Sequence, residues 1–213
     1  MEPYHSGEAT AFDLSGGHPA LNFVNTLDNR FGPAGGTERL CDYRDLLRLT
    51  VQVRLLDSER ADLLGASVGS AAADRALRAA KELREALARV LYGEMDGRAP
   101  HLEDLRVLER YFHEAGRHQA LRWSKQPAQE DLARFTWTWL ESDRSGQLPV
   151  FMLAAAASAL IMSPEHERIR ACDAPTCRWL FLDTSKNHSR RWCNMKVCGN
   201  RAKARTFQQR HRN

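Results

Sequence analysis

Residues 170–212 read RACDAPTCRWLFLDTSKNHSRRWCNMKVCGNRAKARTFQQRHR and contain four of the five cysteines of the chain. The cysteines form two short pairs, Cys172-x4-Cys177 and Cys193-x4-Cys198. Four thiolates complete the tetrahedral shell of Zn²⁺, so such a site holds structure and leaves no open position for catalysis. A short segment with few large apolar side chains also needs a metal to fold. The spacing therefore predicts one structural zinc bound by Cys172, Cys177, Cys193 and Cys198.

The main alternative for paired cysteines is a disulfide, but disulfides form mainly in exported proteins. The chain begins MEPYHSGEATAFDLSGG, with no charged n-region and no apolar h-region, so we expect a cytoplasmic location. In a reducing cytoplasm, paired cysteines act as metal ligands or redox groups. Redox pairs and unrelated buried cysteines remain the open alternatives to zinc. The longest apolar run, 148–162, is too short to span a membrane.

The zinc-site segment also carries a recognisable signature. The tetrapeptide Cys198-Gly199-Asn200-Arg201, the first cysteine pair, the W-L-F-L-D-T-S run at 179–185 and the A-K-A-R tail resemble the CGNR zinc-finger family. Upstream, residues 17–26 (GHPALNFVNT) resemble the opening of the ABATE domain, which precedes this finger in bacterial proteins. The resemblance implies a family of stress-induced transcription regulators. It also implies two domains, an ABATE-like helical domain over 1–164 and a basic CGNR zinc finger over 165–213.

Charge is distributed unevenly between these two parts. Residues 165–213 hold twelve Lys and Arg against four Asp and Glu, a net charge of +8, whereas the chain as a whole carries +4. The remainder is therefore at −4. A mildly acidic body with a strongly basic tail is typical of a regulatory domain joined to a module that binds a polyanion. The plainer alternative is a basic tail that aids solubility or binds nucleic acid without specificity.

The hydrophobic pattern predicts a mainly helical body. Apolar residues recur at helical spacing over 18–29, 72–95 and 102–115, while Asp42 and Asp57 are expected to cap two shorter helices. From 121 to 139 the period changes to two, with Trp123, Trp137 and Trp139 in alternation, which predicts an antiparallel hairpin whose tryptophans belong to the core. An almost wholly apolar stretch over 149–162 indicates a buried helix. We therefore predict a mainly α (α+β) fold, a helical bundle with a small antiparallel β-hairpin, followed by a treble-clef-like zinc finger.

Within the finger, we expect a strand over 178–183 that pairs with a returning segment over 190–193. A basic helix should follow, with Asn200 as its N-cap. Arginine suits bidentate contact with guanine, and the other basic residues suit phosphates. The predicted nucleic-acid contacts are Lys186, Arg190, Arg191, Lys196, Arg201, Lys203 and Arg205. For Arg201, bracing of the zinc loop by hydrogen bonds is the competing interpretation.

A second candidate site lies in the body. His18, Asn22, Asn25 and Thr26 place polar groups along an otherwise apolar helix, where they are either contacts to a small effector or partners of buried backbone groups. No catalytic residue is predicted, because the chain lacks G-x-x-x-x-G-K-[ST] and H-E-x-x-H.

These patterns together predict a transcription regulator, not an enzyme. It would bind double-stranded DNA through one structural Zn²⁺ module, and its N-terminal domain would sense a small molecule or form a homodimer. Two alternatives stay open: an RNA-binding protein that uses the same basic module, and an enzyme in which the finger is purely architectural.

Overall fold

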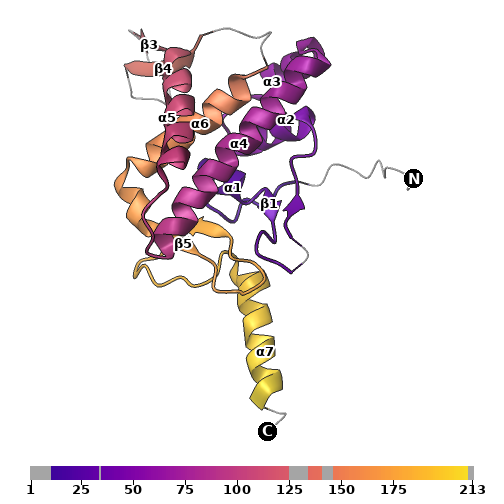
Figure 1. Ribbon diagram of the computed structural model, residues 1–213, viewed down its shortest axis with the longest axis vertical. Helices are drawn as coiled ribbons and strands as arrows, with labels where there is room; N and C mark the ends of the chain where they lie inside the picture. The colour runs from indigo at the N-terminus through magenta and orange to yellow at the C-terminus, as the bar shows by residue number, and fades with distance from the viewer. Residues whose placement is uncertain (1–10, 34, 125–133, 141–145, 211–213) are drawn as a thin grey trace, which may run out of the picture.

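The computed structural model describes residues 11–33, 35–124, 134–140 and 146–210; within the last range the side chains of 205, 206, 209 and 210 are excepted. The described residues form a mainly helical body with three small antiparallel strand pairs and a C-terminal helix that extends away from it (Figure 1). The predicted fold class is thus confirmed. No helix among the described residues is both long and apolar enough to cross a membrane.

The body begins with a short buried helix, α1 (Pro19–Val24). His18 caps it, because its Nδ1 atom accepts a hydrogen bond from the backbone N–H of Ala20 at 3.2 Å. Proline at the first helical position fits this start, since the N–H that it lacks would have no partner inside the helix. A two-residue strand pair follows, β1 (Leu27–Asp28) with β2 (Thr37–Glu38).

Two local capping predictions are confirmed. Asp42 accepts from the N–H of Asp45 at the start of α2 (Tyr43–Gln52), and Asp57 accepts from the N–H of Arg60 at the start of α3 (Ser58–Ser67). Each cap satisfies one of the free N–H groups of a helix N-terminus.

The long helix α4 (Ser70–Met95) crosses the body and packs against α5 (Leu102–Arg117) and α6 (Leu148–Ile161). Its apolar stripe is fully buried at Leu83 and Leu87, as the helical spacing predicts. The helix α6 is buried along most of its length, in agreement with its apolar composition. These helices form one hydrophobic core together with α1 and α2.

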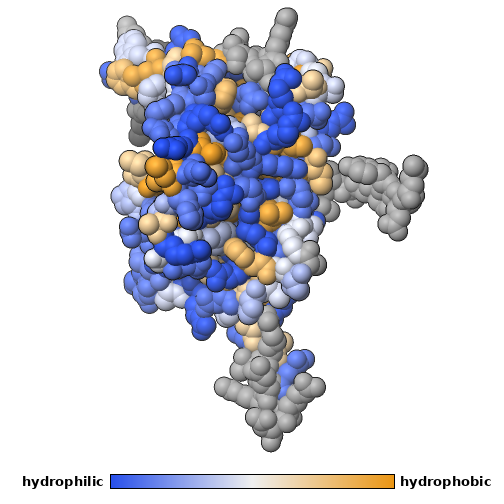
Figure 2. Space-filling view, in the orientation of Figure 1, coloured by the Kyte–Doolittle hydropathy of each residue, from blue (hydrophilic) through white to orange (hydrophobic). Residues whose placement is uncertain are grey.

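The predicted hairpin exists as β3 (Gln119–Trp123) and β4 (Phe135–Trp139), in antiparallel register. The expectation that its tryptophans belong to the core is wrong for two of the three. Trp123 is 57% and Trp137 is 64% exposed, while Trp139 packs against the core. The hairpin extends beyond the body, and Figure 2 shows an apolar patch there on an otherwise largely hydrophilic face.

The C-terminal part starts with a 3₁₀ turn, η1 (Pro164–Arg168), and the strand β5 (Ile169–Ala171). The strand β6 (Leu180–Leu182) pairs with β5, with Ile169 opposite Leu182. The predicted pairing with 190–193 is therefore wrong. In the described part of the chain, that segment instead accepts a backbone hydrogen bond from the N–H of Asp173 to the carbonyl of Arg191 at 2.9 Å. Sequence alone could not choose between the two partners, because each of them directly precedes one of the two cysteine loops.

The last helix is also built differently from the expectation. A π-helical turn, η2 (Met195–Gly199), continues directly into α7 (Asn200–Arg210). Asn194 caps this continuous helix by accepting from the N–H of Lys196 at 3.0 Å. Asn200 is already in helical conformation, and its side chain donates to the carbonyl of Lys196 at 3.0 Å. The predicted N-cap role therefore belongs to Asn194.

Candidate metal centre and basic module

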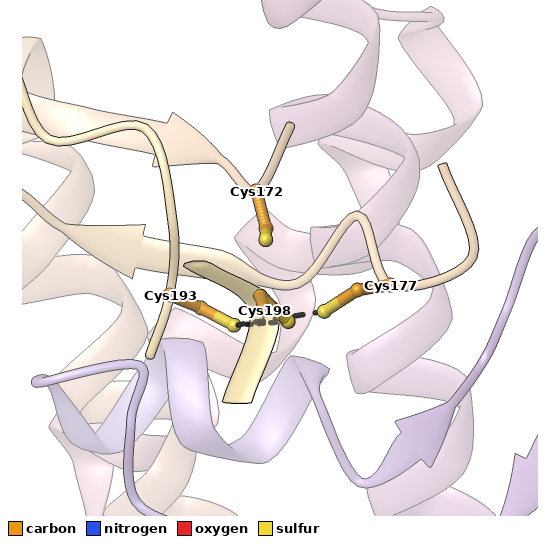
Figure 3. Close-up of side chains that lie close together, drawn as sticks. All are labelled: Cys172, Cys177, Cys193 and Cys198. Carbon is orange, nitrogen blue, oxygen red and sulfur yellow. Dashed lines mark hydrogen bonds between the residues drawn. The ribbon is translucent and has the colours of Figure 1, made fainter. Parts of the chain in front are cut away.

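The four cysteines of the C-terminal part converge on one point (Figure 3). Their sulfur atoms all lie within 4.8 Å of one another, although they come from four different places in the chain. Cys172 directly follows β5, and Cys198 lies in η2. Cys172, Cys193 and Cys198 are buried, and Cys177 is half-buried.

The separation of the sulfurs matches a metal site and not a disulfide. The Sγ atoms of Cys177 and Cys193 are 3.6 Å apart, and those of Cys193 and Cys198 are 3.8 Å apart. A sulfur tetrahedron around Zn²⁺ with bonds of about 2.3 Å has edges of about 3.8 Å. A disulfide would need about 2.05 Å. The donor set therefore fits one structural zinc, which accepts four thiolates and has no remaining position for a substrate.

The electrostatics of this cluster also favour a cation. A hydrogen bond from Cys177 is the main cause that lowers the pKa of the Cys172 thiol to about 2, while the same contact raises the pKa of Cys177 to about 12. Contact with Cys172 and Cys177 raises the pKa of Cys193 as well. The neighbouring sulfurs thus shift one another's pKa in opposite directions, so they do not share one protonation state easily. A divalent ion removes this conflict, because it stabilises all four as thiolates.

A small apolar cluster encloses the cysteines. Phe181 is fully buried beside them, and Trp179 and Trp192 pack against the cluster, as expected for a minimal core. A Cβ atom at Gly199 would lie 2.5 Å from the Sδ atom of Met195, so a side chain there would require the exposed Met195 side chain to shift.

Two charged side chains brace the second cysteine loop. Arg190 lies over the ring of Phe181, 4.6 Å from its centroid, and donates to the carbonyl groups of Trp192 and Cys193. The buried carboxylate of Asp183 accepts from the N–H groups of Ser185 and Arg190, both at 2.9 Å. Burial raises the pKa of Asp183, but these hydrogen bonds outweigh it and hold the pKa below its usual value. The guanidinium of Arg190 thus binds the zinc loop, which is a structural role. Its contact with phosphate remains a prediction.

The remaining basic residues lie on or near the surface of the module. Lys186, Lys196, Arg201 and Lys203 are exposed. Arg191 is also exposed and forms an ion pair with Asp173 at 2.6 Å. Arg205 lies on α7, and its side chain is outside the described part of the chain. The helix contains no acidic residue and points away from the body (Figure 1).

The four polar residues of the body candidate site all bond to the chain itself. Asn22 Oδ1 accepts from Gly16 N–H at 2.9 Å, and Thr26 Oγ1 donates to the carbonyl of Phe23 at 2.7 Å. Asn25 bonds to the backbone of Leu180 in β6, and His18 caps α1. These partners favour the structural interpretation, in which the side chains satisfy buried backbone groups.

Sequence reasoning missed the residues that join the finger to the body. Tyr92 Oη donates to the carbonyl of Arg178 at 2.9 Å, and Trp179 Nε1 donates to Asp28 Oδ1 at 2.9 Å. Arg178 has a φ of 55°, in the left-handed region that few side chains adopt. Nothing in the local pattern marks these positions, because each depends on a partner far away in the chain.

Comparison with known protein families assigns both parts of the chain. A family model named ABATE, described as "Putative stress-induced transcription regulator", matches residues 17–164. A second model, the CGNR zinc finger, matches residues 168–211. A search of curated proteins found no match.

Proposed function

The chain belongs to the ABATE family and carries a CGNR zinc finger, and from this premise we propose that it regulates transcription by binding double-stranded DNA through its zinc module. Residues 165–213 supply the contact with DNA. Residues 1–164 sense a small molecule or form a homodimer. One zinc, bound by the four cysteines, orders the module and takes no part in chemistry.

The observation that carries this proposal is the basic helix α7. It starts two residues after the ligand Cys198 and is continuous with the turn η2, so the metal fixes the direction in which the helix leaves the body. Arg201 and Lys203 are exposed on it, and the described part of the helix presents no acid. A helix of this kind fits the major groove of B-DNA, which is about 12 Å wide.

The basic residues divide by their contacts. Arg201 and Arg205 lie one turn apart on α7 and are our candidates for base edges. Lys186, Arg191, Lys196 and Lys203 are candidates for phosphate contacts, which position a protein without reading sequence. Because it is positively charged, Arg190 is also a candidate for a phosphate contact. It has a second role in bracing the zinc loop through its hydrogen bonds.

The test is selection of bound fragments from genomic DNA by the zinc-loaded protein, followed by titration of a selected duplex across a salt series. Each phosphate contact contributes about −0.9 to the slope of log K against log salt. Lys203→Ala should therefore flatten the slope by about 0.9. The matched control is Arg75→Ala, which removes one exposed positive charge from α4 in the body and should leave the slope unchanged.

Competition with single-stranded RNA of the same sequence separates the two kinds of nucleic acid. Tighter binding of the RNA would replace the proposal with its RNA-binding alternative. An unchanged slope in Lys203→Ala would remove α7 from the interface.

A further inference from the structure

A cavity of about 380 Å³ lies between the segment that follows β1, the second half of α4 and the segment 98–101. The apolar part of its wall comes from Phe31, Ala88, Tyr92, Ala99 and Pro100. Cavities that bind small molecules have volumes of roughly 300 to 1,000 Å³ and are mostly apolar, with a few polar groups that orient the ligand. This cavity therefore has the size and wall of a site for a small ring.

Among the described residues that line this cavity, Arg30 is the one with a buried donor atom that has no hydrogen-bond partner. Its guanidinium pairs with Glu85, and one terminal nitrogen also reaches the carbonyl of Val24 at 3.4 Å. Its Nε atom is buried and has no hydrogen-bond partner among the described residues. Arg89, which also lines the cavity, is held by Asp104 at 2.6 Å. A buried donor without an acceptor is costly, which favours a ligand that supplies an oxygen.

The charges around Arg30 favour an anionic oxygen. Among the described residues, Arg30, Arg84 and Lys81 form ion pairs with two carboxylates, Glu38 and Glu85, and Glu85 also lines the cavity. The network thus holds one positive charge more than it neutralises. The Arg30 side chain is 13% exposed, so water screens its charge less than that of Lys81, which is 33% exposed.

We propose that this cavity binds a small aromatic carboxylate. The carboxylate would accept from Arg30 Nε, and the ring would pack against Phe31 and Tyr92. Bidentate and charge-assisted contacts of arginine with carboxylates are among the strongest hydrogen bonds in proteins.

The same wall is bonded to the zinc module. The rings of Phe31 and Tyr92 meet edge to face, with centroids 4.8 Å apart. Tyr92 Oη donates to the carbonyl of Arg178, and the guanidinium of Arg178 lies 5.6 Å from the centre of the Phe31 ring. Arg178 directly follows the zinc ligand Cys177. A bound ring therefore contacts the two side chains that hold the first cysteine loop, which gives the ligand a direct route to the metal site. The idea that the ligand alters DNA binding through these contacts rests on the proposed function. The binding of the ligand to the cavity does not.

The experiment uses the zinc-loaded full chain without nucleic acid, so its outcome is independent of DNA binding. Benzoate is titrated by calorimetry, with benzamide as its uncharged counterpart. We expect saturable binding of benzoate and at least about tenfold weaker binding of benzamide, since a charge-assisted hydrogen bond contributes roughly 1.5 to 3 kcal/mol. Arg30→Gln should weaken benzoate to a similar extent.

A second variant blocks the cavity without touching charge. Gly93 lines it, and a Cβ atom there meets nothing closer than 3.7 Å, so Gly93→Leu should fold and fill the space. The matched control is Gly116→Leu on α5, where a Cβ atom has no neighbour within 4 Å and the cavity is not involved. Benzoate should bind to the control and not to Gly93→Leu. Failure of wild type to bind benzoate, or equal binding by both leucine variants, would overturn the proposed site.

The route to the metal has its own readout, the rate at which zinc passes to a chromophoric chelator. Benzoate should change this rate in wild type. Tyr92→Phe keeps the ring and loses only the hydrogen bond to Arg178, so it should bind benzoate while its zinc-release rate no longer responds. A rate that benzoate leaves unchanged in wild type would refute the coupling and leave the site itself intact.

Discussion

The side-chain amide of Asn25 forms two hydrogen bonds with the backbone of Leu180. Asn25 Nδ2 donates to the Leu180 carbonyl at 2.8 Å, and the Leu180 N–H donates to Asn25 Oδ1 at 3.0 Å. Asn25 is the C-cap of α1, and Leu180 opens β6, eight residues after the ligand Cys172. Leu180 and Leu182 also belong to the core of the body, whereas Phe181 between them faces the cysteines. One strand thus serves both the body and the zinc module.

Asn25→Ala should weaken this joint. The substitution leaves the N–H and the carbonyl of Leu180 buried without their partners, and each unsatisfied buried group costs about 1 to 3 kcal/mol. We expect the free energy of unfolding to fall by about 2 to 4 kcal/mol. Hydrogen exchange at the Leu180 amide should accelerate along with it. Asn187→Ala, at an exposed position in the finger, is the control and should change stability by less than about 0.5 kcal/mol. A loss no larger than that of the control would show that the joint does not hold the module in place.

Loss of the zinc should affect the body as well as the finger. Cys193→Ser removes one of the four ligands, so the purified protein should contain far less than one zinc per chain and α7 should lose its fixed start. Because β6 is shared, the melting temperature of the helical body should also fall, although its helices should persist in circular dichroism. Cys41→Ser is the matched control, since Cys41 is exposed and lies outside the sulfur cluster. A body that melts at the same temperature with and without zinc would contradict the shared-strand arrangement.

The sequence allowed prediction of features that depend on neighbouring residues. Asp42 and Asp57 could be predicted as helix caps because each side chain accepts from an N–H only three residues away. The spacing of the cysteine pairs likewise indicates a metal site. The partner of β6 could not be predicted in this way. Strand pairing depends on long-range packing, and here the decisive contacts, from Asn25 and Tyr92, come from positions far back in the chain. The hairpin shows the same limit: the alternation of Trp137 with threonines indicates a strand but not whether anything covers its aromatic face.

Glu38→Gln should destabilise the body through Arg84. The two residues form a bidentate pair with both distances at 2.7 Å, and the Arg84 side chain is only 3% exposed. Removing one partner of a buried ion pair costs about 3 to 5 kcal/mol. Arg84 keeps Glu85 and Thr26 as partners, so we expect the lower part of this range, about 3 kcal/mol at neutral pH. Chemical denaturation measures this loss. Glu114→Gln, which removes an exposed pair with Arg117, should cost less than about 0.5 kcal/mol.

The same pair predicts a pH dependence. Burial raises the pKa of Glu38, but its contacts with Arg84 outweigh this and hold the pKa below its usual value. A carboxylate with a lowered folded-state pKa stabilises the fold above its unfolded pKa, and this contribution is lost as the pH falls. The stability difference between wild type and Glu38→Gln should thus be constant near neutral pH and shrink below about pH 4.5. Both proteins lose zinc at acid pH. Because the two are compared at each pH, the effect of this loss on stability cancels in the difference. A difference that stays constant down to pH 3 would exclude Glu38 as the titrating group.

Alanine substitution of the two tryptophans of β4 should lower the free energy of unfolding by different amounts. Trp139 packs against the core of the body, so Trp139→Ala should lower the free energy of unfolding by about 2 kcal/mol, less than the 3 to 5 kcal/mol of a fully buried aromatic residue. Trp137 is 64% exposed and lies opposite Leu121 in the register, so Trp137→Ala loses only a cross-strand pair, which is worth about 0.2 to 1 kcal/mol. Chemical denaturation at several protein concentrations checks both values. Equal costs for the two tryptophans would mean that the aromatic face of the hairpin is covered in solution, and a cost at Trp137 that grows with protein concentration would identify the cover as a second copy of the chain.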